Sequence, residues 1–342
     1  MTVSRRRMGS TNPLCLLLWA TALLSCVCGG VAQSSLSGVP SLSWRIVAEY
    51  PHDAEAFTQG LIYDYRHPED DILFEGTGLY GSSTLRRVPL TTGEPTILAS
   101  LASHLFGEGI TVFNDTRLFQ LTWKAGLIYE YHLPPSFGQE GSTAELVPVT
   151  EWLNPSDEGW GISHDDSFTT LIMSDGTATL WFLDFPASSP SPQPRQEQEP
   201  TVLRTVEVRD GEGRQVPLLN ELEWIRGKVY ANIWQTNTIV VIDPESGQVE
   251  AKILLGDLTQ RAEDADPAER VDVLNGIAWD EAGQRLFVTG KLWPRIYQLE
   301  VEGLNLSEKE EGEESSASGE ESDQGGAAQS RRTTEWLSAL FM

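Results

Sequence analysis

The stretch Phe57-Thr58-Gln59-Gly60-Leu61 is the first of five related phrases in this 342-residue chain. The other four are Phe106-Gly107-Glu108-Gly109-Ile110, Gly159-Trp160-Gly161-Ile162-Ser163, Leu219-Asn220-Glu221-Leu222-Glu223 and Leu274-Asn275-Gly276-Ile277-Ala278. Successive phrases are roughly fifty to sixty residues apart, which is the period range of propellers and repeat arrays. The recurrence predicts a repeat architecture in which the five phrases meet at a shared centre.

Strand-like runs follow each phrase. They are rich in β-branched and aromatic residues, about six residues long, and bounded by Gly, Asp, Asn or Pro, which is typical of strands rather than helices. In the first unit they occupy residues 72–77 and 85–90, and in the last unit residues 286–290 and 296–301. A weaker fourth run, for example residues 248–255, would complete a sheet of about four strands in each unit.

Five such units closed into a ring predict an all-β fold, a five-bladed β-propeller, over residues 41–303. We expect the lone strand at residues 44–50 to pair with the last blade beside residues 296–301, which ties the chain ends together and removes an exposed edge. A β-sandwich followed by a linker is the alternative, although a sandwich does not need five matched phrases. Residues 134–155 and 187–200 are expected to be solvated insertions.

The two ends of the chain differ in composition from the repeats. Residues 1–32 are predicted to be a signal peptide, with three arginines before an apolar run and small residues before Gln33. We therefore expect a secreted protein, extracellular or, in a bacterium, periplasmic; a signal anchor, a twin-arginine signal and a lipoprotein signal are alternatives. Residues 304–342 are predicted to be an acidic, low-complexity, disordered tail. In a eukaryotic host, Asn114 and Asn305 would be glycosylation acceptors.

Composition excludes several classes of function. The net charge of −26 argues against a nucleic-acid partner, because a surface that binds the phosphate backbone needs basic patches. Cys15, Cys26 and Cys28 all lie in the predicted leader, so a mature chain without it has no thiolate for catalysis or zinc binding and no disulfide. The histidines show no paired metal-ligand spacing. We expect a monomer with no membrane span in the mature chain, no metal and no cofactor.

The phrases contain both small and polar residues. The glycines at positions 60, 109, 161 and 276 are expected to let the innermost strands crowd around a central channel. Gln59, Glu108, Asn220 and Glu221 are harder to explain by packing, because buried polar groups are costly without partners. A buried Glu is a candidate proton carrier, since desolvation raises the pKa of its carboxyl group toward neutrality.

Indoles form a second pattern. Trp123, Trp234 and Trp293 follow strands that we interpret as equivalent, and Trp160 lies inside a phrase. These side chains belong either to the core, as aromatic residues of all-β proteins commonly do, or to the lining of a pocket. Lys291 is a lone cation among them, and it would form a salt bridge, pair with Glu108 or polarise a carbonyl group.

The phrases and three further motifs resemble the glutaminyl cyclase family of plants and bacteria. The further motifs are Phe74-Glu75-Gly76-Thr77-Gly78-Leu79-Tyr80-Gly81, Asn232-Ile233-Trp234-Gln235-Thr236 and Thr289-Gly290-Lys291-Leu292-Trp293-Pro294. The resemblance runs in order from residue 44 to residue 301 and leaves out the leader, the two insertions and the acidic tail.

The resemblance implies a propeller that acts as a glutaminyl-peptide cyclotransferase. Such an enzyme converts the N-terminal glutamine of peptides or proteins into pyroglutamate and releases ammonia, and this family is unrelated to the zinc-dependent animal enzymes. Carried over by motif, Glu108 is the implied catalytic acid and base. The implied substrate pocket consists of Phe57, Gln59, Trp123, Trp160, Asn220, Trp234 and Lys291.

Two other classes of function stay open. One is a non-catalytic propeller that serves as a binding platform, because a fold alone does not give a function. The other is a hydrolase or lactonase that depends on a cation in the channel. Carboxylate and amide oxygens are suitable calcium ligands, and the phrases offer those of Glu108, Glu221, Asn220 and Asn275.

Overall fold

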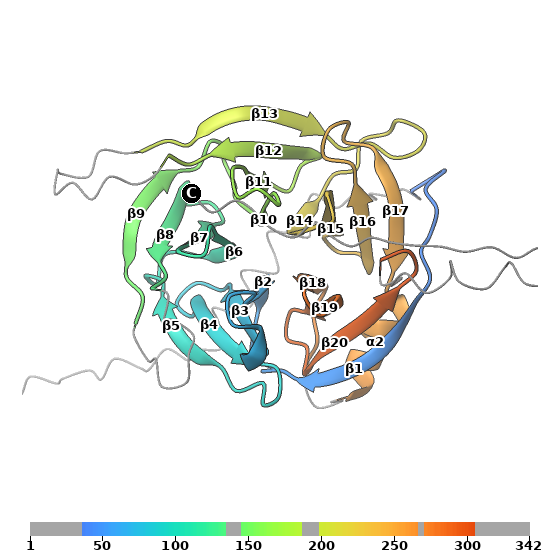
Figure 1. The fold of residues 1–342 in the computed structure, drawn as a ribbon, viewed down its shortest axis with the longest axis horizontal. Coiled ribbons are helices and arrows are strands. Elements are labelled where there is room, and N and C mark those ends of the chain that lie inside the picture. Colours follow the sequence, from blue (N-terminus) through green and yellow to red (C-terminus); the bar gives the residue numbers. More distant parts are fainter. Residues whose placement is uncertain (1–35, 135–144, 187–197, 266–269, 305–342) are drawn as a thin grey trace, which may run out of the picture. The chain divides into compact units, whose positions relative to one another are not determined.

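Five antiparallel sheets of four strands each are arranged in a ring (Figure 1). The computed structural model describes residues 36–134, 145–186, 198–265 and 270–304, which all belong to one compact unit. The predicted signal peptide, all of the predicted acidic tail except Leu304, and most of the residues 187–200 insertion lie outside the described residues. Secretion, glycosylation and the monomeric state stay predictions.

Each sheet forms one blade, and four of the five blades are consecutive in sequence. Blade one consists of β2 (Thr58–Tyr63), β3 (Ile72–Thr77), β4 (Thr84–Pro89) and β5 (Thr96–Ser100). Blade two consists of β6 (Gly107–Phe113), β7 (Arg117–Thr122), β8 (Leu127–His132) and β9 (Pro148–Leu153). Blade three consists of β10 (Ile162–His164), β11 (Leu171–Ser174), β12 (Thr179–Asp184) and β13 (Thr201–Glu207). Blade four consists of β14 (Leu219–Ile225), β15 (Lys228–Ile233), β16 (Thr238–Ile242) and β17 (Val249–Leu254).

The fifth blade joins the two ends of the described chain. It consists of β18 (Leu274–Asp280), β19 (Arg285–Gly290), β20 (Arg295–Val301) and, as its outer strand, β1 (Trp44–Pro51). Strand β1 pairs with β20 in antiparallel register, from Trp44 opposite Val301 to Pro51 opposite Arg295. The predicted five-bladed propeller, closed by its N-terminal strand, is confirmed.

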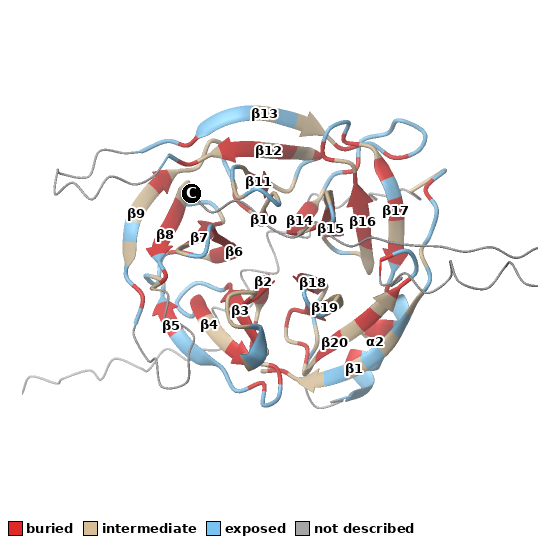
Figure 2. Cartoon of the chain, viewed as in Figure 1, coloured by how far each residue is buried: buried red, intermediate tan, exposed pale blue. Residues whose placement is uncertain are grey.

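The hydrophobic core lies between the blades. Each of five buried clusters takes side chains from two neighbouring blades, so that together they fill all the contacts around the ring. Strands β2, β6 and β18 are buried along their whole length, whereas the outer strand β13 is mostly exposed (Figure 2). The innermost strands of the five blades, β2, β6, β10, β14 and β18, form the centre of the ring, which we call the hub. Polar groups that these strands bury there need hydrogen-bond partners.

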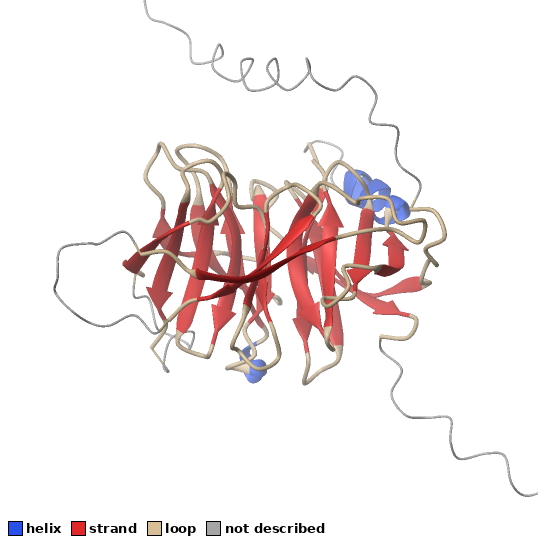
Figure 3. Cartoon of the chain, turned by 90° about the horizontal axis from the view of Figure 1, so that it is seen from above, coloured by secondary structure: helices blue, strands red, loops and turns tan. Residues whose placement is uncertain are grey.

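Two elements differ from the sequence-based expectation. Residues 134–155 were expected to be a solvated insertion, but they contain strand β9, and Trp152 on that strand is only 1% exposed. Its indole donates a hydrogen bond to Glu130 Oε2 at 2.9 Å, which anchors the strand. Helix α2 (Gly256–Ala265) was not predicted; it lies at one end of the strands (Figure 3) and packs Leu258 and Ala262 on the core between blades four and five.

Beside α2, the described residues contain only a short 3-10 helix, η2 (Pro68–Asp70). No helix among them is long and apolar enough to span a bilayer.

The phrase glycines let neighbouring inner strands touch, as predicted. A Cβ atom on Gly109 would lie 2.7 Å from the Trp160 carbonyl oxygen, and one on Gly161 would lie 2.0 Å from the Asn220 carbonyl oxygen. Real Cβ atoms do not approach backbone this closely, so these positions admit no side chain. Gly276 is different, because its φ of +119° is itself a conformation that favours glycine.

Candidate active site

One side chain from each inner strand occupies the same place in the phrase, immediately before the glycine position. The five residues are Gln59, Glu108, Trp160, Asn220 and Asn275. In four of the blades the pairing of the inner strand with its neighbour shifts register at this place, for example between Gly107 and Ile110. A bulge of this kind redirects a side chain out of the regular ladder. The phrases thus place a carboxyl group, an indole and three amide side chains at equivalent positions of the five inner strands.

Hydrogen bonds join three of these side chains. The amide of Gln59 donates from Nε2 to Glu108 Oε1 at 3.1 Å. Asn275 Nδ2 in turn donates to Gln59 Oε1 at 3.3 Å and to the Thr58 carbonyl oxygen at 3.0 Å. The second oxygen of Glu108 has no hydrogen-bond partner in the described part of the chain. One side of the carboxyl group is therefore held in place, and the other is free to exchange a proton.

Burial governs the charge of Glu108. The residue is 4% exposed, and desolvation raises the pKa of its carboxyl group well above the ordinary value. The positive charge of Lys291 opposes this rise, and the negative charge of Glu158 adds to it. Lys291 is also 4% exposed, and burial lowers the pKa of its ammonium group although Glu108 and Asp272 oppose the change. Burial thus moves both pKa values toward neutral pH, where a carboxyl group can both accept and donate a proton.

Lys291 has no salt bridge within the described residues, which removes the simplest structural explanation for it. Its ammonium nitrogen lies 4.8 Å from the centre of the Phe57 ring, at cation–π distance. Its backbone N–H donates to the Val273 carbonyl oxygen at 2.9 Å. Trp123 and Trp234 donate to Phe106 and Leu218 in the same way, at 3.0 Å and 2.9 Å.

These matching bonds correct one interpretation of the sequence. The equivalent of Trp123 and Trp234 in the fifth blade is Lys291, and not Trp293. Trp293 is fully buried in the core, and its indole donates to the Asp272 carbonyl oxygen at 2.8 Å. Trp293 lies two positions after Lys291 in the same turn, and only the backbone pairing shows which of the two is equivalent to Trp123 and Trp234.

Partly exposed aromatic rings surround this end of the hub. Trp160 and Trp234 meet edge to face at 5.4 Å between ring centres, and Phe106 meets Trp123 at 5.5 Å and Phe57 at 6.2 Å. Two glycines make room for them, because a Cβ atom on Gly78 or Gly176 would collide with the ring of Phe106 or Trp160. The aromatic rings provide apolar surface, and the side chains of Gln59, Glu108 and Asn275, which we call the polar floor, provide hydrogen-bonding atoms. This combination suits a small substrate group with a few hydrogen-bonding atoms.

Glu158 was missed in the sequence. Its Oε2 atom accepts hydrogen bonds from the indoles of both Trp123 and Trp160, at 2.8 Å and 2.9 Å. It lies two residues before Trp160, in a turn with no recurring pattern, so only the fold connects it with Trp123 from another blade. Asn275 was considered only as a cation ligand, yet it holds Gln59.

Several polar atoms at the hub lack partners among the described residues. They are Oδ1 of Asn220, Oδ1 of Asn275 and Nδ2 of Asn232, all buried. Leaving such an atom unpaired costs about 1–3 kcal/mol. A bound molecule with amide or amine groups would satisfy them, and Asn220 is among the residues that the sequence predicts to contact substrate.

Glu221 has a different environment from the other polar phrase residues. Its two carboxyl oxygens accept hydrogen bonds from the backbone N–H groups of Leu61, at 3.3 Å, and Ile277, at 2.9 Å. It thus links blade four to blades one and five. Among the described residues, no group of three or more His, Cys, Asp or Glu side chains is placed to hold a metal ion.

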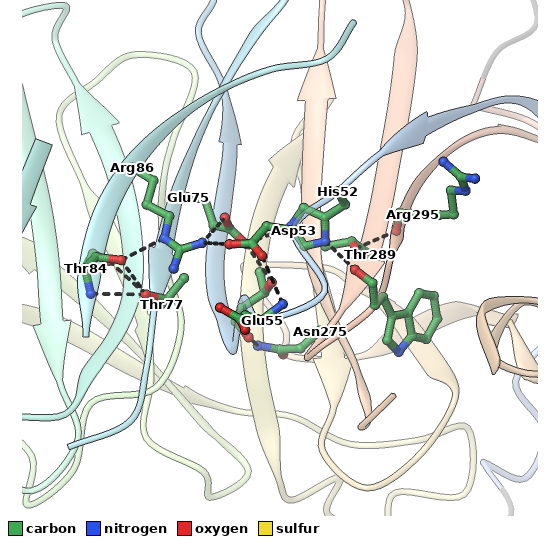
Figure 4. A network of polar contacts seen from close by, with 12 residues as sticks. His52, Asp53, Glu55, Glu75, Thr77, Thr84, Arg86, Asn275, Thr289 and Arg295 are labelled. Atoms are coloured by element: carbon green, nitrogen blue, oxygen red, sulfur yellow. Dashed lines mark hydrogen bonds and ion pairs between the residues drawn. The ribbon is translucent and has the colours of Figure 1, made fainter. Parts of the chain in front are cut away.

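A buried ion pair between His52 and Glu75 lies beside the strand that carries Gln59 (Figure 4). His52 Nε2 lies 3.0 Å from Glu75 Oε1, and the same Glu75 oxygen accepts a hydrogen bond from Thr58 Oγ1 at 2.7 Å. His52 Nδ1 donates to the Trp293 carbonyl oxygen at 2.7 Å. Burial alone would lower the pKa of His52, but the Glu75 carboxylate raises it overall. The pair joins the turn after Lys291 to the strand that carries Gln59.

Comparisons with known proteins agree on one family. A model of the glutamine cyclotransferase family matches residues 17–301. A glutaminyl-peptide cyclotransferase from Arabidopsis thaliana is 40% identical over 304 residues, which cover 87% of this chain and 85% of the relative. The crystal structure of a glutaminyl cyclase from Myxococcus xanthus superposes with a TM-score of 0.61 at 31% identity, covering 77% of this chain and 98% of that one.

Proposed function

The chain belongs to the glutamine cyclotransferase family, and we propose that it closes the N-terminal glutamine of peptides or proteins into pyroglutamate with Glu108 as the proton shuttle. The family membership makes the activity that of a glutaminyl-peptide cyclotransferase. The role of each side chain and the independence from metal are our proposal. The observation that carries it is the Glu108 carboxyl group, which Gln59 holds by one oxygen and whose other oxygen has no hydrogen-bond partner among the described residues.

The reaction needs little beyond positioning and proton transfer. The nucleophile, the α-amine, and the electrophile, the side-chain amide carbon, belong to the same residue, so holding the glutamine folded replaces a collision. The α-amine has a pKa of about 7.7–8.0, so a useful neutral fraction exists at mild pH. The aromatic rings around the hub would hold the folded side chain and exclude water.

Proton movement is the step assigned to Glu108. The bond from the α-nitrogen to the amide carbon forms, and the carbonyl oxygen becomes an oxyanion. One Glu108 oxygen accepts the proton that the attacking nitrogen gives up. Glu108 delivers a proton to the amide nitrogen, the carbon–nitrogen bond breaks, and ammonia leaves. The carboxyl group finishes the turnover in the state in which it began, and no metal is required to balance the step.

Lys291 and Asn220 are proposed to stabilise the oxyanion. Lys291 is a buried cation within electrostatic range of Glu108 and is not neutralised by a salt bridge among the described residues. Asn220 is 2% exposed, and its Oδ1 is unpaired. Its amide Nδ2 would face the oxyanion, while the unpaired Oδ1 would accept from the substrate amine. Donors that are already desolvated and oriented stabilise developing charge strongly.

Ammonia release from a glutamine-initiated dipeptide, measured with EDTA present, tests the proposal. Glu108→Gln is expected to lower kcat by about 10²–10⁴-fold, the usual contribution of general acid–base catalysis. Its thermal unfolding midpoint should stay close to that of the unsubstituted protein, because the new amide keeps the shape of the carboxyl group. A folded Glu108→Gln protein with full activity would refute the shuttle, and loss of activity with EDTA would refute metal independence. If the unsubstituted protein is folded but shows no turnover at all, a non-catalytic binding platform would be favoured.

A further inference from the structure

We propose that Glu158 is a positioning residue, which holds the indoles of Trp123 and Trp160 against the substrate glutamine by means of a single carboxylate oxygen. This inference rests on the proposed function, because it assigns these indoles to the substrate. It adds a residue that contributes to substrate recognition without contacting the reacting atoms.

The geometry of Glu158 is specific. Both indole N–H groups donate to Oε2, at 2.8 Å from Trp123 and 2.9 Å from Trp160. The other oxygen, Oε1, lies 3.3 Å from Lys124 Nζ in an ion pair whose lysine is 54% exposed. The two indoles come from different blades, since Trp123 follows β7 and Trp160 precedes β10. The backbone of the two segments is joined by the Gly159 N–H, which donates to the Trp123 carbonyl oxygen at 3.1 Å, and the single Glu158 oxygen fixes the angle between the two rings.

The fixed rings lie next to the reacting groups. The carbonyl oxygen of Trp160 accepts the N–H of Gly109, the residue after Glu108, at 2.8 Å. The ring of Trp160 also meets Trp234, and the ring of Trp123 meets Phe106. Indoles are donors only, so without an acceptor each ring would gain rotational freedom that the substrate must remove again on binding.

Glu158 also acts through its charge. It is 30% exposed at its side chain, and its carboxylate raises the pKa of Glu108, against the effect of Lys291. The two effects of Glu158, hydrogen-bond acceptance and charge, can be separated by substitution. A glutamine at this position keeps an oxygen for both indoles but loses the charge, whereas an alanine loses both.

The experiment compares Glu158→Gln, Glu158→Ala and the control Asp157→Asn in the ammonia-release assay over a range of pH. Glu158→Ala is expected to lower kcat/KM by about 10–100-fold, mainly through KM, because displaced positioning groups cost up to about that factor. Glu158→Gln should keep KM within about threefold, and the limb of its pH profile that reports Glu108 should move to lower pH. Asp157→Asn should behave like the unsubstituted protein, because it removes an exposed negative charge next to Glu158 and neither of the two indole bonds.

Two results would overturn the inference. One is a folded Glu158→Ala protein with unchanged kcat/KM. The other is a Glu158→Gln protein whose KM rises as far as that of Glu158→Ala, since an acceptor oxygen would then make no difference. Thermal unfolding of each variant shows whether it is folded, and Glu158→Gln provides the test if Glu158→Ala does not fold. The proposed function fails in a different way, namely by an active Glu108→Gln protein or by an unsubstituted protein that makes no pyroglutamate.

Discussion

Glu108 and Glu221 are buried carboxyl groups at adjoining positions of the same repeated phrase, and their hydrogen-bond partners differ. Within the part of the chain that the structure describes, Glu108 has one hydrogen-bond partner, the side chain of Gln59, and its second oxygen has none. Glu221 has two backbone partners, the N–H groups of Leu61 and Ile277, one on each oxygen. Desolvation raises the pKa of both carboxyl groups well above the ordinary value.

The difference in hydrogen-bond partners distinguishes Glu108, which we assign to catalysis, from Glu221, which holds neighbouring blades together. A raised pKa is common to both, so it marks burial and not function. Glu221 stands where the other blades have the close-contact glycine, and its side chain reaches across the hub to satisfy N–H groups of two other blades. Glu108 stands one position earlier, inside the register shift between Gly107 and Ile110, and its carboxyl group accepts a bond from the Gln59 side chain. The partners of a buried acid therefore indicate its role better than its pKa does.

Lys291→Met is expected to have the largest of the three effects that follow from this comparison. Lys291 acts on Glu108, so the substitution should lower kcat by about 10²–10³-fold, as loss of an oxyanion donor does. Because the lysine charge lowers the pKa of Glu108, the Glu108 limb of the pH profile should also move to higher pH. The measurement is kcat against pH.

Stability is the control for Lys291→Met. Methionine keeps the apolar part of the side chain, and a buried cation without a salt bridge among the described residues contributes little to folding. The unfolding midpoint should therefore stay the same or rise. An unchanged kcat in a folded Lys291→Met variant would show that Lys291 does not take part in catalysis. It would also weaken the functional distinction between Glu108 and Glu221.

Glu221→Gln is expected to show the opposite pattern. Glutamine has one acceptor oxygen, so one of the two N–H groups that Glu221 satisfies would face an NH₂ donor and lose its bond. The expected loss of unfolding free energy is about 1–3 kcal/mol, the cost of an unsatisfied buried donor. Denaturant unfolding measures it, and kcat should stay within a few-fold of the unsubstituted value. A stable Glu221→Gln protein with kcat lowered as far as in Glu108→Gln would erase the distinction between the two acids.

The sequence predicts the ring of blades well, because each phrase and its following strands repeat in every unit. The outer strand β9 was missed because it lies in a stretch rich in Pro and polar residues, where pairing with β8 decides the conformation. Helix α2 was missed because it belongs to no repeat and only Leu258 and Ala262 are buried along it. Features outside the repeat are set by tertiary contacts, which a repeat pattern does not contain.

The candidate site was predicted in part for the same reason. The phrases and the resemblance brought together Gln59, Glu108 and Trp160, and the structure places these residues at one end of the hub. Glu158 and the ion pair of His52 with Glu75 were not predicted, because each connects segments from different blades. Trp293 was misassigned because the turn after β19 shifts the position that faces the hub by two residues.

Glu223→Gln is expected to leave the hydrogen bonds of the hub in place, and it tests the role of the hub carboxyl groups in stability through its pH dependence. Glu223 lies two residues after Glu221, is 6% exposed and accepts the Trp279 N–H at 2.9 Å. Burial raises the pKa of its carboxyl group from 4.5 to about 8. Between these two values the folded protein binds more protons than the unfolded chain, so stability is greatest below pH 4.5 as far as this group is concerned, and it falls as the pH rises toward 8.

Glutamine at position 223 keeps the oxygen that accepts the Trp279 N–H but cannot ionise, so it should remove this part of the pH dependence. The slope of unfolding free energy between pH 5 and 8 should become less negative by up to about 1.4 kcal/mol per pH unit. Denaturant unfolding at several pH values measures the slope, with the exposed Glu94→Gln as the matched control. Glu221 changes stability in the same direction, so a slope should remain. An identical slope in Glu223→Gln and in the unsubstituted protein would mean that burial does not raise the pKa of Glu223 in the folded protein. The same explanation would then fail for the raised pKa of Glu221 and Glu108.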